Sequence, residues 1–128
     1  MDLNTIVSKL LKIDASKRIK FIILFGSTSK GTNDSLSDID IAVYYEGTSR
    51  ERFRFRAKAL GNLPHKVDLH IFQDLPIIVK KEVISGKVLY SPSFELTFDE
   101  AMKVIKEFDS FEKYYNEYLH ELKMGVEA

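Results

Sequence analysis

The sequence contains no cysteine. This absence excludes disulfide bonds, thiolate metal sites and thiol nucleophiles. Any bound metal ion must therefore be held by oxygen atoms or by imidazole nitrogens.

Long hydrophobic runs are also missing. No apolar stretch approaches the roughly 20 residues that a membrane span needs, and residues 1–12 lack the apolar core of a signal peptide because polar side chains interrupt them. The hydrophobic share of 45% and the charged share of 30% are those of an ordinary soluble globular protein. We therefore expect a cytoplasmic protein with no membrane contact.

Charge of one sign is not in excess, because 19 basic residues balance 19 acidic ones. General nucleic-acid binding is thus not expected, since it needs a strongly basic face. The charges are nevertheless uneven, with a basic stretch over residues 50–66 and an acidic end from Glu95 onward. The basic run at residues 50–56 is either a solvated face or a grip on a phosphate or an acidic partner.

The pattern of apolar residues predicts one α/β (α+β) domain over residues 1–128, with a small mixed sheet of three to four strands packed with helices. Neither an internal repeat nor a linker suggests a second domain. Buried or alternating runs predict strands at residues 19–25, 38–45 and 66–72 and an edge strand at 87–90. Helical spacing predicts helices at residues 3–11, 48–60 and 75–85, and a long helix opened by the capping-box pair Thr97 and Glu100.

Two of these helices carry specific expectations about their buried faces. Residues 52–56 also alternate as a strand would, so a strand is the alternative to the helix over residues 48–60. In the helix, we expect Phe53, Ala57 and Leu60 to face the core and Phe55 to lie partly outside it. In the last helix, a stripe of aromatic side chains is expected in the core, and Tyr114, which lies off the stripe, is expected to contact a partner. The stripe consists of Phe108, Phe111, Tyr115 and Tyr118.

Three carboxylates stand out as candidate metal ligands. Asp38 and Asp40 are two apart on one strand, so their side chains leave the same face about 6.6 Å apart. Their strand neighbours on the other face are apolar, so we expect the acids on the face that helices do not cover. Asp68 lies on the polar face of a later strand. Three such carboxylates can hold two Mg²⁺ or Mn²⁺ ions, the arrangement used in phosphoryl transfer.

The loop after the first strand predicts a phosphate site. Gly26 would let the backbone approach a ligand, and the Ser27 hydroxyl with the following amides would hold a triphosphate. Lys30 is the nearest cation. His70 shares a face with Asp68, but a simple surface histidine is the favoured interpretation. Asp34 and Asp74 are interpreted as turn residues.

These residues form a pattern, Gly-Ser, ten residues, Asp-x-Asp, that resembles the nucleotidyltransferase superfamily that includes DNA polymerase beta. The stretch LFGSTSKGTNDSLSDIDIAVYY is similar to the minimal nucleotidyltransferases, or MNT proteins. The resemblance implies the nucleotidyltransferase fold. It implies that Gly26 and Ser27 hold a nucleoside triphosphate, that Asp38 and Asp40 bind both metal ions, and that Asp68 completes the metal site and helps to activate the attacking hydroxyl.

The chain departs from many relatives at Lys30, where they have an arginine, so a point charge replaces a bidentate fork. Resemblance to the MNT antitoxins also implies a partner, a HEPN-domain ribonuclease toxin, and a hetero-oligomer with it. The first hypothesis is a Mg²⁺-dependent protein adenylyltransferase that transfers AMP from ATP to this toxin. The alternatives are a binding-only antitoxin and a nucleotidyltransferase that acts on a small hydroxylated molecule.

Overall fold

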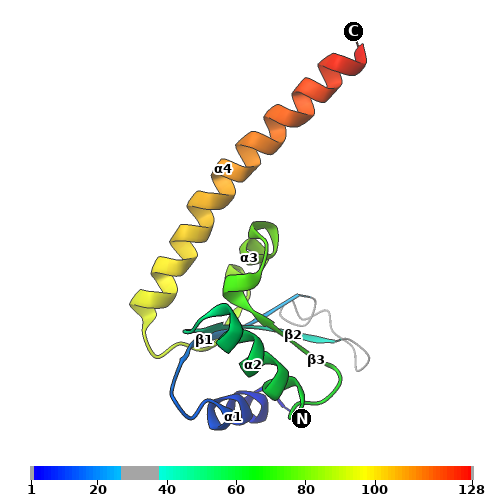
Figure 1. Cartoon of the computed structure of the whole chain (residues 1–128). Coiled ribbons are helices and arrows are strands. Elements are labelled where there is room, and N and C mark those ends of the chain that lie inside the picture. The colour runs from blue at the N-terminus through cyan, green and yellow to red at the C-terminus, as the bar shows by residue number, and fades with distance from the viewer. Residues whose placement is uncertain (1, 27–37, 128) are drawn as a thin grey trace.

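A computed structural model describes residues 2–26 and 38–127 of the chain. The expected α+β class is confirmed, with a four-stranded mixed sheet and helices on it (Figure 1). The elements follow in the order α1 (Leu3–Ile13), β1 (Ile19–Phe25), β2 (Ile39–Tyr45), α2 (Ser49–Leu60), β3 (Val67–Ile71), the 3-10 turn η1 (Phe72–Asp74), α3 (Ile77–Ile84), β4 (Lys87–Tyr90) and α4 (Phe94–Glu127).

The sheet has the strand order β3-β2-β1-β4. β1 pairs antiparallel with β2 and with β4, whereas β2 and β3 are parallel and joined by the crossover helix α2. β4 therefore lies at an edge, as its short length predicted. Because β3 runs in the direction of β2, the carboxylates of these two strands can stand side by side.

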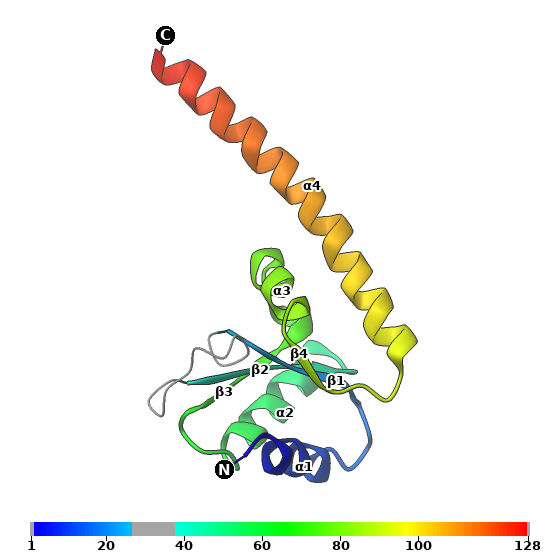
Figure 2. The ribbon, with the colours of Figure 1, turned by 180° about the vertical axis from the view of Figure 1, so that it is seen from behind.

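Helices cover both faces of the sheet. Helices α1 and α2 pack on one face, where Ile6 and Leu10 meet the inward side chains of β1, β2 and β3. On the other face, α3 and the first half of α4 pack through Val83 and Val104 (Figure 2). This second face also carries the acids, so the expectation that helices leave it uncovered is wrong. The polar part of this face lies where β2 and β3 begin, at Asp40 and Asp68.

Helix α2 begins with the predicted capping box, in which Thr48 Oγ1 accepts from Glu51 N and Glu51 Oε1 accepts from Thr48 N. Its buried face is not the predicted one. Phe55 and Ala59 are buried, whereas Phe53 is 70% exposed. The helix adopts this rotation because the Phe55 ring stacks on Tyr45, with centroids 4.3 Å apart and planes 8° from parallel.

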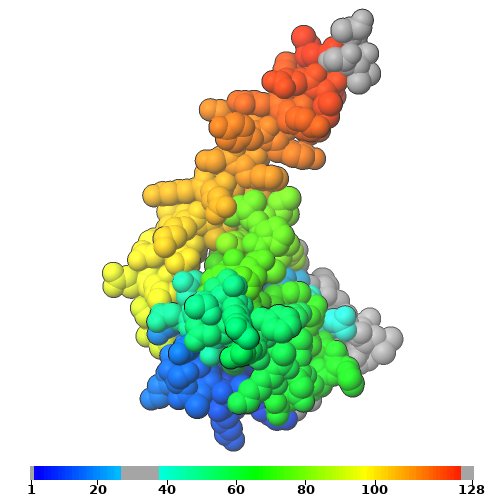
Figure 3. Space-filling model, viewed as in Figure 1, coloured from blue at the N-terminus to red at the C-terminus, as the bar shows by residue number. Residues whose placement is uncertain are grey.

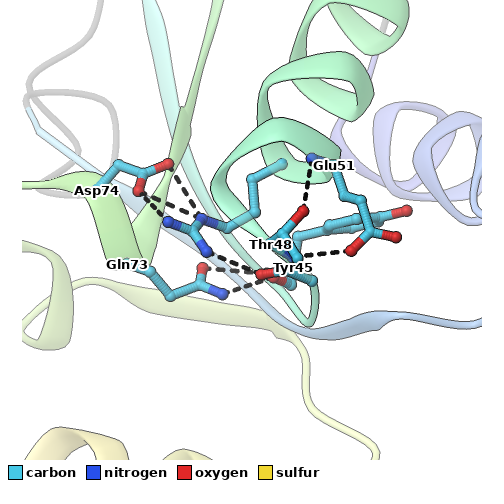
Figure 4. A network of polar contacts seen from close by, with 7 residues as sticks. Tyr45, Thr48, Glu51, Gln73 and Asp74 are labelled. Carbon is cyan, nitrogen blue, oxygen red and sulfur yellow. Dashed lines mark hydrogen bonds and ion pairs between the residues drawn. The ribbon is translucent and has the colours of Figure 1, made fainter.

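Two arginines of the basic run at residues 50–56 stabilise the fold. Arg52 donates in a fork to Asp74, with its Nη2 2.7 Å from Oδ1, and donates through Nη1 to the Gly47 carbonyl. Arg56 Nε donates to the Leu69 carbonyl at 2.8 Å, on the free side of the edge strand β3. Figure 4 shows the network around Asp74, Tyr45 and the capping box. These contacts join the start of α2 to η1, so Asp74 is an ion-pair partner as well as a turn residue.

Helix α4 begins at Phe94, so the predicted capping box of Thr97 and Glu100 is wrong. Ser93 caps it instead, because Ser93 Oγ accepts from Leu96 N at 3.2 Å. Thr97 lies inside the first turn, and its hydroxyl donates to the Ser93 carbonyl. The Thr-x-x-Glu pattern therefore falls within a helix that an earlier serine had started.

The aromatic stripe of α4 is also not core. Phe108 and Phe111 are half-buried, but Tyr115 and Tyr118 are 52% and 59% exposed. Figure 3 shows why: the second half of α4 stands clear of the rest of the molecule. Tyr114 is exposed, as a contact residue requires. Among the described residues, no helix is both long and apolar enough to cross a membrane.

Candidate active site

The candidate site starts where β1 ends. Phe25 pairs with Asp40 of β2, so Gly26, the next residue, lies beside the Asp40 side chain. A Cβ at Gly26 would stand only 2.7 Å from Asp40 Oδ2, and Gly26 has φ of +80°. The positive φ favours glycine at this position, because a side chain there would strain the backbone, and a Cβ would also displace the Asp40 carboxylate.

Asp40 and Asp68 are direct neighbours across the sheet. In the parallel register of β2 and β3, Asp40 pairs with Asp68 and Ile41 with Leu69. Since side chains alternate between faces, both carboxylates leave the same face while Ile41 and Leu69 enter the core. The structure thus brings together two of the predicted metal ligands.

His70 completes a compact group with these two acids. Its Nε2 lies 3.2 Å from Asp68 Oδ2 and 3.6 Å from Asp40 Oδ1. The His70 ring also packs near Phe25, with centroids 5.6 Å apart. The interpretation of His70 as a simple surface residue is therefore wrong. The signal was its position two residues after Asp68, which places both side chains on one face. We call Asp40, Asp68 and His70 the Asp–His cluster.

Asp38 lies at the margin of this cluster. It directly precedes β2 and is exposed, and the next amide, Ile39 N, donates to the Lys66 carbonyl at 2.7 Å. Its charge helps to raise the pKa of Asp40, so the two carboxylates interact. The other predicted phosphate-site residues, Ser27 and Lys30, lie outside the described residues.

The pKa of the Asp40 carboxyl is raised above its ordinary value of 3.8. Burial is the main cause, because it disfavours the charged form. The hydrogen bond and charge of His70 oppose this shift, while the neighbouring charges of Asp68 and Asp38 add to it. The site thus concentrates negative charge that a cation would relieve.

The donor set of the Asp–His cluster fits a divalent ion. One ligand atom from each member lies within 4.8 Å of the other two. The carboxylate oxygens suit Mg²⁺ or Mn²⁺, and an imidazole nitrogen suits Mn²⁺ better than Mg²⁺. His70 Nε2 lies beside both carboxylates, and its contact with Asp40 opposes the rise in the pKa of Asp40 that burial causes. Asp38 is not part of this close triad. It is exposed and directly precedes β2.

Comparison with known proteins identifies the class and then the family. A sequence model described as "Polymerase beta, Nucleotidyltransferase" matches residues 8–95, which is more than half of the chain. This protein is therefore of the nucleotidyltransferase type. The chain belongs to the polymerase beta nucleotidyltransferase family, and the resemblance noted from its Gly-Ser and Asp-x-Asp pattern is confirmed.

One curated relative is 36% identical over 77 residues, "Putative protein adenylyltransferase MJ1547" of Methanocaldococcus jannaschii. The match covers 59% of this chain and 59% of the relative. The chain therefore spans about three fifths of the length of the relative it matches.

Solved structures confirm the fold. A chain of a crystal structure of a toxin–antitoxin with AMP-PNP superposes with a TM-score of 0.75 at 24% identity, covering 94% of this chain and 98% of that one. A chain of the tri-AMPylated Shewanella oneidensis HEPN toxin in complex with MNT antitoxin gives a TM-score of 0.68 at 22% identity, with 93% of each chain covered. At this level of identity, the likeness supports the nucleotidyltransferase fold.

Proposed function

We propose that this protein is an adenylyltransferase that transfers AMP from ATP to a hydroxyl of a partner protein, and that this partner is a HEPN-domain toxin. The observation that carries the proposal is the register pair of Asp40 and Asp68, with Gly26 held against Asp40. The relative named as a protein adenylyltransferase and the fold shared with toxin–antitoxin structures support it. The protein would then act as an antitoxin in the cytoplasm.

Each predicted site residue has a role in this proposal. Gly26 brings the backbone close to the triphosphate, and Ser27 and Lys30, which follow it in the sequence, bind its phosphate oxygens. Asp38, Asp40 and Asp68 are the residues that would hold Mg²⁺ or Mn²⁺, as two ions. Such ions, when bound, stabilise negative charge on the transferring phosphoryl group and its leaving group.

Transfer joins the acceptor oxygen to the α-phosphorus of ATP and breaks the bond between that phosphorus and the bridging oxygen, so pyrophosphate leaves. The acceptor hydroxyl must lose its proton during this step. Asp68 assists that loss because it is the more exposed carboxylate of the pair, with half of its side chain accessible to an incoming group. Asp40 is less exposed and lies beside Gly26, where the nucleotide phosphates would lie.

We propose that residues 1–128 form a single minimal domain. In a hetero-oligomer, a bound partner would present the acceptor to it. The partner must therefore present its hydroxyl to the open side of the Asp–His cluster. A tyrosine hydroxyl is the expected acceptor, as the resemblance to the MNT antitoxins implies.

The experiment mixes the protein with a HEPN-domain toxin from the same genome, ATP and Mg²⁺, and measures the mass of the toxin. We expect the mass of one or more AMP groups to be added, located on tyrosine by peptide mass spectrometry. Asp68→Asn should abolish transfer and retain part of the ATP binding. The matched control is Asp109→Asn, an exposed aspartate on α4, which should transfer AMP as the unchanged protein does.

Three outcomes would overturn this proposal or part of it. If the toxin keeps its mass but loses its ribonuclease activity in the mixture, the binding-only alternative is correct. If Asp68→Asn transfers AMP normally, Asp68 is not the third carboxylate of the site. Transfer to a small hydroxylated compound in place of the toxin would favour the third hypothesis.

A further inference from the structure

Helix α4 extends well beyond the body of the molecule. Its first half packs on α3 and on the sheet, and its second half has no neighbour in either view (Figures 1 and 2). All described side chains from residue 112 to residue 124 are exposed. We call residues 112–124 the α4 extension.

One apolar stripe runs through both halves of this helix. Its residues are spaced alternately four and three apart, which keeps them on one face and is the spacing of coiled-coil seams. They are Val104, Phe108, Phe111, Tyr115, Tyr118 and Leu122. Val104 is buried against the body, Phe108 and Phe111 are half-buried, and Leu122 is 48% exposed. The α4 stripe is thus covered at one end and bare at the other.

An exposed apolar stripe of this kind is expected to bind a partner. Isolated helices gain most of their stability from packing an amphipathic face, and a stretch this short is marginal alone in water. Contiguous exposed apolar side chains are also characteristic of interaction sites. Since the covered and bare parts share one face, a partner helix that continues the packing of α3 would bury the extension.

The charged residues beside the stripe indicate which partner fits. Glu107, Glu112 and Glu121 flank it, and all three are exposed. Two copies of α4 paired in parallel would place Glu107 against Glu112 of the other copy. Antiparallel pairing centred on Tyr114 would place Glu107 against Glu121. Like charges at such positions are destabilising, so the acidic rim disfavours a second copy and favours a basic partner.

The contact between α3 and the α4 stripe already pairs a basic side chain with an aromatic ring. Where α3 covers the stripe, it holds Lys81 Nζ 5.7 Å from the centre of the Phe108 ring, next in sequence to Glu107. A lysine over an aromatic ring gains cation–π attraction. A partner helix with Lys or Arg beside its apolar face would repeat this contact at Tyr115 and Tyr118.

The α4 stripe also lies on the side of the sheet that carries the Asp–His cluster. α3 and α4 pack on the sheet face that includes Phe25 and Ala42. Asp40, Asp68 and His70 project from that same face, because they alternate with the core residues of β2 and β3. A protein docked along the α4 stripe beyond α3 is therefore on the side of the sheet that carries the Asp–His cluster.

We propose that the α4 extension is the docking surface for the acceptor protein, and that it binds an α-helix whose apolar stripe is bordered by lysine or arginine. This inference rests on the proposed function for the identity of the acceptor. The extension would then supply the surface on which the acceptor protein binds.

The test measures binding of the full-length protein to the HEPN-domain toxin by titration, and AMP transfer in the same samples. Leu122→Glu should weaken binding about 30-fold or more, because it places an unpaired charge in the apolar stripe that the partner would bury. The matched control is Met124→Glu, which places the same charge two residues away, off the stripe, at a side chain that is 57% exposed. It should bind within about threefold of the unchanged protein, since it lies outside the interface. Circular dichroism and ATP binding verify that both variants are folded.

Further measurements separate the alternatives. Affinity should fall as salt rises, and Glu112→Lys with Glu121→Lys should weaken binding, because both changes remove the charge attraction. Unchanged binding by Leu122→Glu, or tighter binding by the lysine variant, overturns the proposal. A dimer of the free protein by light scattering that Leu122→Glu dissociates assigns the surface to a second copy instead.

Failure of this proposal differs from failure of the proposed function. Asp68→Asn should still bind the toxin through the α4 extension, although it transfers no AMP. Binding that depends on Leu122 without any transfer would retain the docking surface and reject the adenylyltransferase. Transfer that proceeds equally in Leu122→Glu would retain the enzyme and reject the docking surface, and the absence of any complex would reject both.

Discussion

Gly26 and Asp40 are in such close contact that one methyl group on Gly26 would stand 2.7 Å from Asp40 Oδ2. The contact joins the end of β1 to the candidate metal site on β2. It makes the position of the carboxylate depend on the absence of a side chain on the neighbouring strand.

Gly26→Ala should therefore damage the site more than the fold. The alanine must adopt a φ of +80°, which costs about 1–2 kcal/mol, and it must push Asp40 aside. A displacement of this kind should reduce AMP transfer about 100-fold. The control is Gly61→Ala, since Gly61 has φ of −67° and its nearest neighbour would be 3.5 Å from the new Cβ. Equal activity of the two variants in a transfer assay would contradict the assigned role of Gly26.

His70→Phe should make the protein more dependent on a divalent ion. The substitution keeps a ring beside Phe25 and removes the Nε2 that lies 3.2 Å from Asp68. In the presence of a chelator we expect a loss of about 1 kcal/mol, or about 4 °C in Tm. Mg²⁺ should then stabilise the variant more than the unchanged protein. His65→Phe, at an exposed histidine, is the control. If Mn²⁺ stabilises His70→Phe less than the unchanged protein, His70 is itself a metal ligand.

Asp40→Asn should raise the metal-free stability of the protein at pH 7. The pKa of Asp40 is raised in the folded state, mainly by burial, so its ionisation costs stability. The stability linked to this group is fully present below pH 3.8 and is lost as the pH rises through the higher folded pKa. The difference in Tm between Asp40→Asn and the unchanged protein should thus appear at neutral pH and vanish in acid. A variant that is less stable at pH 7 would contradict this assignment.

Arg52→Lys should destabilise the fold and leave ATP binding unchanged. A lysine cannot reproduce the fork to Asp74 together with the bond to the Gly47 carbonyl. Because Asp74 is about half exposed, the expected loss in free energy of unfolding is small, about 1 kcal/mol in urea titrations. Arg50→Lys, at an exposed arginine, is the control. A fall in ATP affinity would show that the basic run binds phosphate.

The sheet and its acids could be predicted because alternation is a local property of the backbone. Ile39, Ile41 and Val43 define one face of β2 and leave Asp40 on the other, whatever packs against them. The parallel register that pairs Asp40 with Asp68 depends on the length of the α2 crossover. The sequence pattern showed that Asp68 could meet Asp40 but did not contain the register itself.

The errors arise where a pattern permits more than one partner. Helix α2 offers two apolar lines, through Phe53 and through Phe55, and the choice depends on Tyr45 as a stacking partner. The basic run was expected to be solvated or to bind a phosphate or an acidic partner, yet Arg56 binds the free carbonyl of an edge strand. The α4 stripe has the period of a buried face, but periodicity does not say whether the same chain or another one buries it.

The pairing of β2 with β3 has a consequence for how relatives of this protein can change in length. Adding or deleting a single residue inside β3 before Asp68 would turn this side chain toward α2 and bring an apolar neighbour to the face that carries the Asp–His cluster. Insertions should therefore collect in the turn between α2 and β3, over residues 61–66, where the exposed chain can absorb them. Within the strands themselves, only changes of two residues keep Asp40, Asp68 and His70 on one face of the sheet.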